Sequence, residues 1–333
     1  MQKLKIPHFW YSNDEDTTSP LTAKILYPFS ILYRGLARLD RVVTLTRKSP
    51  LPVICIGNLT MGGAGKTPTA RAILELVKEH GKFATPCFLM RGYGGNHNGP
   101  LEVDPTIHTS WDVGDEALMQ SRYAPVIIAA DRYKGVLLAQ RSGYDLIIMD
   151  DGFQNPKLKK NLSFIVVDGG FGFGNGYCFP SGPLREPVSV GIKRANAAII
   201  INRNADTDLK ALGQFKTFNA TITTDNPVQE NEKRSVVAFA GIARPEKFFD
   251  TLEASGYQLY AHYAFPDHHT YTHGDIKKIE ARAEEGKVGI ITTEKDWVRL
   301  SDNWKKKIDC LKISVTLDDA FKKTFFNALN KLS

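Results

Sequence analysis

The chain has 333 residues, of which 42% are hydrophobic and 24% charged, and its net charge is +7. This composition is typical of a globular protein of about two domains, and without a run of 18 apolar residues we expect no bilayer-spanning helix. Four scattered cysteines with no C-x-x-C pair argue against a disulfide framework or a zinc site, while the positive charge suggests an anionic partner.

The first predicted element is a basic amphipathic helix over about residues 19–46. Residues 19–48 carry six basic side chains and one acid, a local net charge of +5. At about 100° per residue, six apolar side chains fall within about 40° of one direction: Ile25, Phe29, Leu32, Leu36, Leu39 and Val43. Arg34, Arg38 and Arg41 fall on the opposite face, and Pro28 should lie near the start or at a kink. The pattern alone leaves open whether this helix packs on its own domain or lies at a membrane interface.

Apolar runs then alternate with helical patterns. We expect strands at 52–57, 85–90, 124–130, 144–150, 162–168 and 196–202, and helices near 67–80, 114–122 and 131–142. Continuous apolar strands between helices predict a parallel sheet covered on both faces, which binds ligands beyond the carboxyl ends of its strands.

A second, smaller set of elements follows a polar connection at 223–234. We expect strands at 235–241, 257–265, 287–293 and 310–315, and helices near 245–255, 275–285 and 317–331. The predicted organisation is an N-terminal helical region (1–48), a nucleotide-binding α/β domain (49–222) and a smaller α/β domain (223–333), whose last helix is free to return to the first domain. A cleft should lie between the two lobes.

The stretch "NLTMGGAGKTP" (58–68) predicts a phosphate-binding loop between a strand and a helix. It ends as the pattern G-x-x-x-x-G-K-[ST] does, although Thr60 stands in place of the first glycine. Glycines let backbone N–H groups curl around phosphate oxygens, Lys66 would reach the β- and γ-phosphates, and the Thr67 hydroxyl would ligate Mg²⁺. The predicted nucleotide-binding residues are Thr60, Gly62, Gly63, Ala64, Gly65, Lys66 and Thr67.

Asp150 and Asp151 end an apolar strand, where the acid that holds Mg²⁺ is expected beside a phosphate loop. An ATPase or GTPase switch with the loop K-G-G-x-G-K-[ST] is the main alternative, but Met61 occupies the position of its first lysine. A nucleic-acid ATPase is a third interpretation, against which no basic tract interleaved with aromatics occurs outside the N-terminal segment.

The chain resembles the tetraacyldisaccharide 4'-kinase family along most of its length. The matching stretches include "RGYGG" (91–95), "DRYKG" (131–135), "DDGFQN" (150–155), "SGPLREP" (181–187), "FPDHHTYT" (265–272) and "TTEKDWVRL" (292–300). The resemblance implies a P-loop kinase-like fold and an enzyme that uses ATP and Mg²⁺ to phosphorylate the 4'-hydroxyl of the disaccharide 1-phosphate precursor of lipid A. It also implies a peripheral protein on the cytoplasmic face of the bacterial inner membrane, near anionic lipids. Neither a nucleic acid nor an obligate protein partner is expected.

The resemblance further implies roles for individual residues. Asp115 is the expected general base, paired with His268, which the family's motif favours over His269. The other candidates are Arg132 and Arg185 for phosphate contacts, Tyr93 and Gln154 for substrate positioning, and Glu116 and Glu186 as metal-binding or orienting acids. Of these two acids, Glu116 is expected among the metal ligands, and Glu186 joins Tyr93, Arg132, Gln154 and Arg185 as the five expected substrate contacts. Asn155 departs from the family's usual histidine, which puts one substrate contact in doubt. The glycine-rich segment 169–183 is expected to form a mobile loop near the site.

Overall fold

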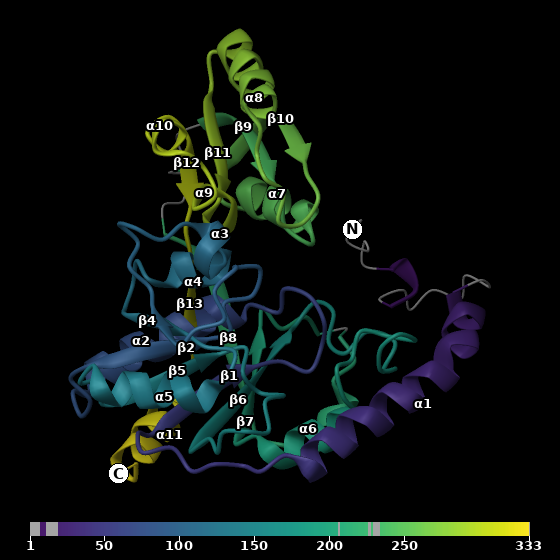
Figure 1. Cartoon of the computed structure of the whole chain (residues 1–333). Helices are drawn as coiled ribbons and strands as arrows, with labels where there is room; N and C mark the ends of the chain where they lie inside the picture. Colours follow the sequence, from purple (N-terminus) through teal and green to yellow (C-terminus); the bar gives the residue numbers. More distant parts are fainter. Residues whose placement is uncertain (1–6, 11–18, 206, 226–227, 229–233, 333) are drawn as a thin grey trace.

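The computed structural model describes residues 7–10, 19–205, 207–225, 228 and 234–332. In this part of the chain, a large lobe contains a nine-stranded sheet and a smaller lobe contains a four-stranded sheet (Figure 1). A long N-terminal helix runs along one side of the large lobe.

The large sheet has the strand order β13-β8-β7-β6-β1-β5-β2-β4-β3. Only the two edge strands, β13 and β3, pair antiparallel with their neighbours, and the seven strands between them are parallel. The strands are β1 (Val53–Gly57), β2 (Pro86–Met90), β3 (Leu101–Glu102), β4 (Val126–Ile128), β5 (Leu146–Asp150), β6 (Leu162–Asp168), β7 (Ala197–Ile201), β8 (Thr217–Thr224) and β13 (Ile313–Leu317). Every residue of β1, β2 and β5 is buried, as the continuous apolar runs predicted.

Helices cover both faces of this sheet. Successive residues of β1 point to opposite faces, so Ile54 and Ile56 pack with α2, α4 and α11, whereas Val53 and Cys55 pack with α5 and α6. The helices of this lobe are α2 (Lys66–His80), α3 (Ser110–Val113), α4 (Asp115–Gln120), α5 (Arg132–Arg141), α6 (Val188–Gly191), α11 (Asp319–Asn330), η2 (Ile192–Arg194) and η3 (Lys210–Leu212). The predicted parallel sheet between two layers of helices is confirmed.

The smaller lobe repeats this arrangement around a parallel sheet of order β10-β9-β11-β12. Its strands are β9 (Arg234–Ala240), β10 (Tyr257–Ala264), β11 (Gly289–Thr293) and β12 (Asp309–Leu311). The helix α7 (Pro245–Ala254) covers one face and α8 (His273–Gly286) covers the other. Two short helices, α9 (Glu294–Trp297) and α10 (Asp302–Lys305), follow β11.

The stretch 310–315, predicted as one strand, belongs to two sheets. β12 ends at Leu311 in the small lobe, and β13 begins at Ile313 on the edge of the large sheet. The following helix α11 then buries Phe321 and Phe325 against the large sheet. The sequence pattern missed this crossing because both halves are short extended segments separated by the single residue Lys312.

One face of α1 (Ser19–Val43) is docked on the large lobe. Ser30 is buried and donates a hydrogen bond to the carbonyl of Cys178 at 2.7 Å, with its hydroxyl 2.8 Å from that of Ser181. At the end of the helix, Arg41 forms an ion pair of 2.8 Å with Glu186. Pro28 lies inside the helix. The segment 169–183, expected as a mobile loop near the site, packs beneath α1, and residues 169–183 do not line the cavity described below.

A second face of α1 is exposed. The six residues of the predicted apolar stripe, which we call the α1 stripe, have exposed fractions of 57–70%: Ile25, Phe29, Leu32, Leu36, Leu39 and Val43. Arg34 and Arg38 are also exposed. Among the described residues, no helix is both long enough and apolar enough to cross a membrane.

Candidate active site

A cavity of about 1570 Å³ lies between the two lobes. The large lobe contributes residues 61–68 and side chains that follow β2, β4 and β5, and the small lobe contributes α7 and the loops after β10 and β11. Both sheets therefore present the carboxyl ends of parallel strands to the cavity, which is where α/β proteins bind their ligands.

The phosphate loop connects β1 to α2 and forms one wall of this cavity. Gly62 and Gly65 have φ angles of 105° and 83°, which favour glycine, and a Cβ atom at Gly65 would meet Ile201 Cδ1 at 2.6 Å. Thr60 lies before the turn and pairs through its backbone with Leu184, outside the lining residues. The missing first glycine therefore leaves the curved part of the loop intact.

The two acids at the end of β5 have different environments. Asp150 is buried, and burial together with the nearby Asp151 carboxylate raises its pKa to about 6. Asp151 accepts two hydrogen bonds from the Arg185 guanidinium, at 2.9 and 3.3 Å, and lies 3.7 Å from the ammonium of Lys66. Lys66 and Arg185 thus share one carboxylate at the mouth of the loop.

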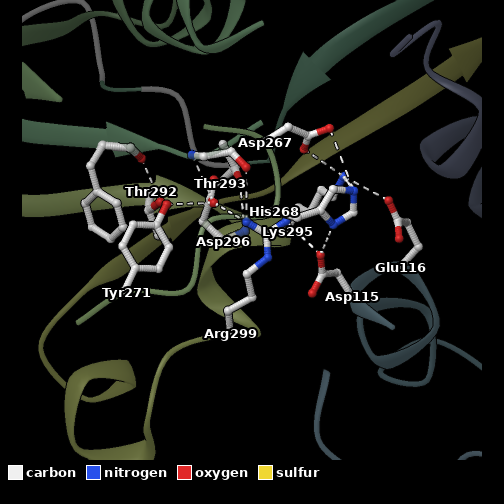
Figure 2. A network of polar contacts seen from close by, with 12 residues as sticks. Asp115, Glu116, Asp267, His268, Tyr271, Thr292, Thr293, Lys295, Asp296 and Arg299 are labelled. Atoms are coloured by element: carbon white, nitrogen blue, oxygen red, sulfur yellow. Dashed lines mark hydrogen bonds and ion pairs between the residues drawn. The ribbon is translucent and has the colours of Figure 1, made fainter. Parts of the chain in front are cut away.

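Across the cavity, His268 and Asp115 come together from different lobes (Figure 2). Asp115 is the first residue of α4, and His268 lies in the loop after β10 with a φ of 58°. Nδ1 of His268 is 2.6 Å from Oδ2 of Asp115, and the same oxygen accepts a hydrogen bond of 2.8 Å from Arg299. Burial opposes ionisation of Asp115, but these two partners outweigh it and lower its pKa to about 2. Asp115 is therefore an ionised carboxylate that orients the imidazole.

Arg299 is itself fixed by a buried network that the sequence analysis missed. It donates hydrogen bonds to Asp296 at 2.8 Å and to the carbonyl of Gly241 at 3.0 Å. Asp296 is fully buried and also accepts from the Tyr271 hydroxyl at 2.7 Å. The sequence feature that could have indicated these residues is the stretch "TTEKDWVRL" at the end of a predicted strand, since the carboxyl ends of parallel strands carry site residues.

Lys295 connects the other groups of this wall (Figure 2). Its Nζ atom lies 2.9 Å from Oε1 of Glu116, 3.3 Å from Oδ1 of Asp267 and 3.2 Å from Nε2 of His268. Burial by itself would lower the pKa of Lys295, but the carboxylates of Glu116 and Asp267 raise it above its usual value. An ammonium group thus faces the imidazole nitrogen that is not bonded to Asp115.

Neighbouring Glu294 holds the two lobes together. Its carboxylate accepts from Arg71 on α2 at 2.5 Å and from the Tyr123 hydroxyl at 2.6 Å. Arg71 also donates to Gln120 at 2.7 Å, and all three charged or amide groups are buried. Separating a buried, hydrogen-bonded ion pair is strongly destabilising, because it leaves a buried charge without its partner. This contact therefore fixes α9 against the large lobe.

The model of the family described as tetraacyldisaccharide-1-P 4'-kinase matches residues 22–331 of the chain. The chain belongs to the tetraacyldisaccharide 4'-kinase family.

Named relatives match over nearly their whole length. A tetraacyldisaccharide 4'-kinase of Methylorubrum extorquens is 42% identical over 320 residues, which cover 95% of each chain. That of Caulobacter vibrioides is 41% identical over 331 residues, covering 95% of this chain and 96% of the relative. A crystal structure of LpxK from Aquifex aeolicus in complex with ATP has a TM-score of 0.72 and 25% identity, and the match covers 93% of this chain and 98% of that one.

Four of the five residues expected to contact the substrate of a tetraacyldisaccharide 4'-kinase line the cavity: Tyr93, Arg132, Gln154 and Arg185. Tyr93 has a ring centroid 5.9 Å from that of His268. Arg132 is buried, donates to the carbonyl of Ala129 at 2.6 Å, and its Nε atom has no hydrogen-bond partner among the described residues. Burial and the charge of Arg91 lower the pKa of Arg132 to about 10.

The fifth, Glu186, is not among the lining residues. Its carboxylate accepts hydrogen bonds from Arg194 at 2.7 and 2.8 Å and pairs with Arg41 of α1 at 2.8 Å. Its other contact is a hydrogen bond of 3.3 Å from Gln154. Glu186 therefore anchors α1 next to a cavity residue.

Asn155, at the position where the family resemblance predicts a histidine, lines the cavity. Its side-chain oxygen accepts a hydrogen bond of 3.0 Å from the backbone of Lys157, and its carbonyl accepts one from the Lys160 ammonium. Here the residue shapes the turn after Asp151, a use of asparagine that histidine shares poorly.

Two observations fit a divalent cation beside the phosphate loop of this tetraacyldisaccharide 4'-kinase. Oδ1 of Asp150 is buried without a hydrogen-bond partner among the described residues, and Thr67 hydrogen-bonds to the same carboxyl group. Nucleotide-bound Mg²⁺ uses one or two carboxylates together with phosphate oxygens and water. The described part of the chain contains no group of three or more His, Cys, Asp or Glu side chains that could hold a metal ion.

Proposed function

We propose that the protein transfers the γ-phosphoryl group of ATP to the 4'-hydroxyl of the tetraacylated disaccharide 1-phosphate precursor of lipid A. The observation that carries the proposal is the position of the His268–Asp115 pair, which faces a complete phosphate loop across one cavity in a chain of this family. A phosphate loop alone is common to many activities, whereas a positioned imidazole opposite it is what transfer to a hydroxyl requires.

On the large-lobe wall, Lys66 and the N–H groups of the loop bind the phosphates of ATP. Lys66 and Arg185 are held in place by Asp151, and phosphate oxygens would compete for both cations. Asp150, Thr67 and, at the facing side, Glu116 would hold Mg²⁺, which neutralises charge on the phosphates. Arg132, whose buried Nε atom has no hydrogen-bond partner in the described part of the chain, supplies a further positive charge to the cavity.

On the opposite wall, His268 Nε2 is the atom that accepts the proton of the 4'-hydroxyl. The family resemblance implies Asp115 as the base, but its Oδ2 atom already accepts from both His268 and Arg299, and its pKa of about 2 makes it a weak base. An Nδ1–H donated to Asp115 leaves the lone pair of Nε2 toward the cavity. We therefore assign proton acceptance to His268 and orientation of its ring to Asp115.

The alternative of an ATPase or GTPase switch is not favoured. Those loops need a lysine where this chain has Met61, and a switch gives no reason for a buried carboxylate to orient an imidazole in the cavity. A protein or DNA that stimulated ATP hydrolysis without phosphorylation of a lipid would reverse this preference.

Incubation of the purified protein with γ-labelled ATP and the disaccharide 1-phosphate tests the proposed reaction. We expect a labelled bisphosphate that depends on both protein and divalent cation. Label released only as inorganic phosphate, equally with and without the lipid, would contradict the proposal.

We further propose that α1 places the enzyme on an anionic membrane surface, at the cytoplasmic face of the inner membrane. The α1 stripe is exposed although another side of the same helix is docked on the large lobe. These apolar side chains are therefore available to contact the apolar part of a membrane. Arg34 and Arg38 fall on the face of α1 opposite the stripe and are exposed, so they add positive charge to the helix, whereas Arg41 is bound to Glu186 and is left out of the membrane contact.

Flotation with anionic vesicles separates these two contributions. Leu32→Ser with Leu36→Ser should weaken binding by roughly 3 kcal/mol, since burying each leucine contributes about 1.5–3 kcal/mol. Arg34→Gln with Arg38→Gln should weaken it by at most about 2 kcal/mol, at about 1 kcal/mol per charge, and high salt should reproduce part of that loss. Lys277→Gln with Lys278→Gln, which removes two exposed charges from α8, is the matched control. Equal flotation of all variants would show that α1 is not a membrane contact.

A further inference from the structure

Lys295 lies where the two halves of the proposed reaction meet, yet the mechanism above gives it no task. It is the second residue of α9, directly beyond the carboxyl end of β11, and its side chain lines the cavity. Its ammonium contacts Glu116 from the large lobe and Asp267 and His268 from the small lobe (Figure 2). One cation therefore touches both the expected cation-binding acid and the expected proton acceptor.

The contact with His268 has a direct consequence for the acceptor hydroxyl. Because Nδ1–H is donated to Asp115, Nε2 carries the lone pair, and the Lys295 ammonium donates to it across 3.2 Å. A hydroxyl that gives its proton to Nε2 must come within about 3 Å of that atom. The hydroxyl thus replaces the ammonium as hydrogen-bond partner and comes to lie beside it.

The same geometry places the ammonium next to the phosphoryl group. In an in-line transfer the phosphorus approaches the attacking oxygen to about 3–3.5 Å, with its three equatorial oxygens around it. The Lys295 ammonium, once displaced from His268 Nε2, lies next to the attacking oxygen. Its nearest new hydrogen-bond acceptor is then an equatorial oxygen of the phosphoryl group. Glu116 keeps the cation at this position through their 2.9 Å ion pair.

We propose that Lys295 is a catalytic residue that binds an equatorial oxygen of the phosphoryl group during transfer, opposite Lys66. In this step the bond between the hydroxyl oxygen and phosphorus forms, and the bond from phosphorus to the bridging oxygen breaks. The electron pair of the broken bond leaves with ADP, and the hydroxyl proton goes to His268 Nε2. Lys295 stays protonated and only exchanges hydrogen-bond partners. The inference rests on the proposed function.

A purely structural task for Lys295 would duplicate contacts that the same segment already makes. Glu294 binds Arg71 and Tyr123, and Arg299 binds Asp115, so the small lobe is docked on either side of Lys295 by buried groups. The Lys295 ammonium instead contacts groups that line the cavity. Its removal should therefore spare the docking of the lobes and affect the reaction.

The test compares Lys295→Met with Arg122→Met in the full-length protein. Arg122 lies over the ring of Trp297, 4.6 Å from its centroid, so it contacts the same helix α9 from the large lobe but does not line the cavity. For each variant we would measure kcat and KM for transfer to the disaccharide 1-phosphate, and the affinities for ADP and for ADP with aluminium fluoride, which mimics a phosphoryl group in transfer.

For Lys295→Met we expect kcat to fall about 10²–10³-fold, as for other lost donors to transition-state charge, with both KM values within about threefold. The affinity for ADP with aluminium fluoride should fall by a similar factor while that for ADP changes less than about twofold. Arg122→Met should leave all these quantities within about threefold. Lys295→Arg keeps the charge and should recover at least about tenfold of the lost kcat.

Two results overturn the assignment. A kcat within about threefold of wild type in Lys295→Met, or an equal loss of affinity for ADP and for ADP with aluminium fluoride, would show that Lys295 only supports the structure, whatever the stability of the variant. If Lys295→Met fails to fold, a folded Lys295→Arg with no more activity than the background decides against the proposal. Failure of the wild-type protein to form the bisphosphate is a different result, which overturns the proposed function and this inference with it.

Discussion

The two walls of the cavity are built in different ways. The phosphate-loop wall comes from one lobe, where residues 58–67 follow β1 and the acids at 150–151 lie at the end of the adjacent strand β5. The opposite wall needs both lobes, because His268 and Lys295 follow β10 and β11 in the small sheet while Asp115 and Glu116 begin α4 in the large lobe.

Because of this difference, we expect ATP binding to depend on the first wall and phosphoryl transfer to depend also on the second. The first wall is fixed by local backbone geometry and by the sheet, so it should bind ATP however the lobes are placed. The second wall exists only while α9 is docked, through contacts such as that of Arg71 with Glu294. Damage to the first wall should therefore remove all function, and damage to the second should lower kcat while sparing ATP affinity.

The largest effect is expected for Lys66→Ala. No other group on the first wall can replace an ammonium at the β- and γ-phosphates, so transfer should fall to background, more than about 10⁴-fold. Lys78→Ala, on the exposed face of the same helix and paired with Glu75, is the control and should be as active as wild type. Bisphosphate formation is the measurement. Activity of Lys66→Ala within a few-fold of wild type would mean that ATP reacts elsewhere.

The second prediction concerns the wall shared by the two lobes. His268→Ala and Asp115→Asn should each lower kcat by about 10²–10⁴-fold with the KM for ATP within about threefold, because they affect proton transfer and not nucleotide binding. Since the two groups act as one unit, the double variant should be little worse than the more damaged single variant. The measurement is the steady-state kinetics of wild type, the two single variants and the double variant. If the losses of kcat multiply in the double variant, His268 and Asp115 have independent roles.

Most of the fold could be predicted because its signals are local. Buried parallel strands are continuous apolar runs, and the glycines of the phosphate loop mark the turn from β1 to α2. The two terminal helices show the limit of such signals. Both are amphipathic, but α11 buries Phe321 and Phe325 in the core, whereas α1 exposes its whole stripe. A hydrophobic stripe indicates that something covers it, and the rest of the fold decides what that is.

The site residues that could be predicted are those that belong to a recognisable sequence motif. The loop and the acids at 150–151 were found from the motif, and the family's motifs indicated His268 and Asp115, 153 positions apart. Arg299 and Lys295 were missed, since they become site residues only through lobe docking. Glu186 was placed among the substrate contacts because its tight pairing with Arg41 and Arg194 cannot be read from the spacing of the three residues.

The smallest expected effect concerns the contribution of the ionised Asp115 carboxylate, in the second wall, to the free energy of unfolding. The pKa of Asp115 is lowered from 3.8 to about 2 in the folded protein, mainly by His268 and Arg299 acting against burial. A lowered folded-state pKa stabilises the protein at pH values above the unfolded value, and the contribution is lost as pH falls through the folded one. A shift of about 1.8 pKa units corresponds to roughly 2.5 kcal/mol, so Asp115→Asn should lower the free energy of unfolding by roughly that amount.

Denaturant unfolding of wild type and Asp115→Asn between pH 7 and pH 3 gives the measurement. The difference should stay constant from pH 7 to about pH 4.5 and shrink below about pH 4, because Asp115 of the unfolded wild type then takes up a proton while the folded carboxylate stays ionised down to about pH 2. Asp302→Asn, which removes an exposed carboxylate with 93% of its side chain in solvent, should show no comparable difference. A difference for Asp115→Asn that vanished already near pH 6 would show that His268 and Arg299 do not keep the Asp115 carboxylate ionised in the folded protein.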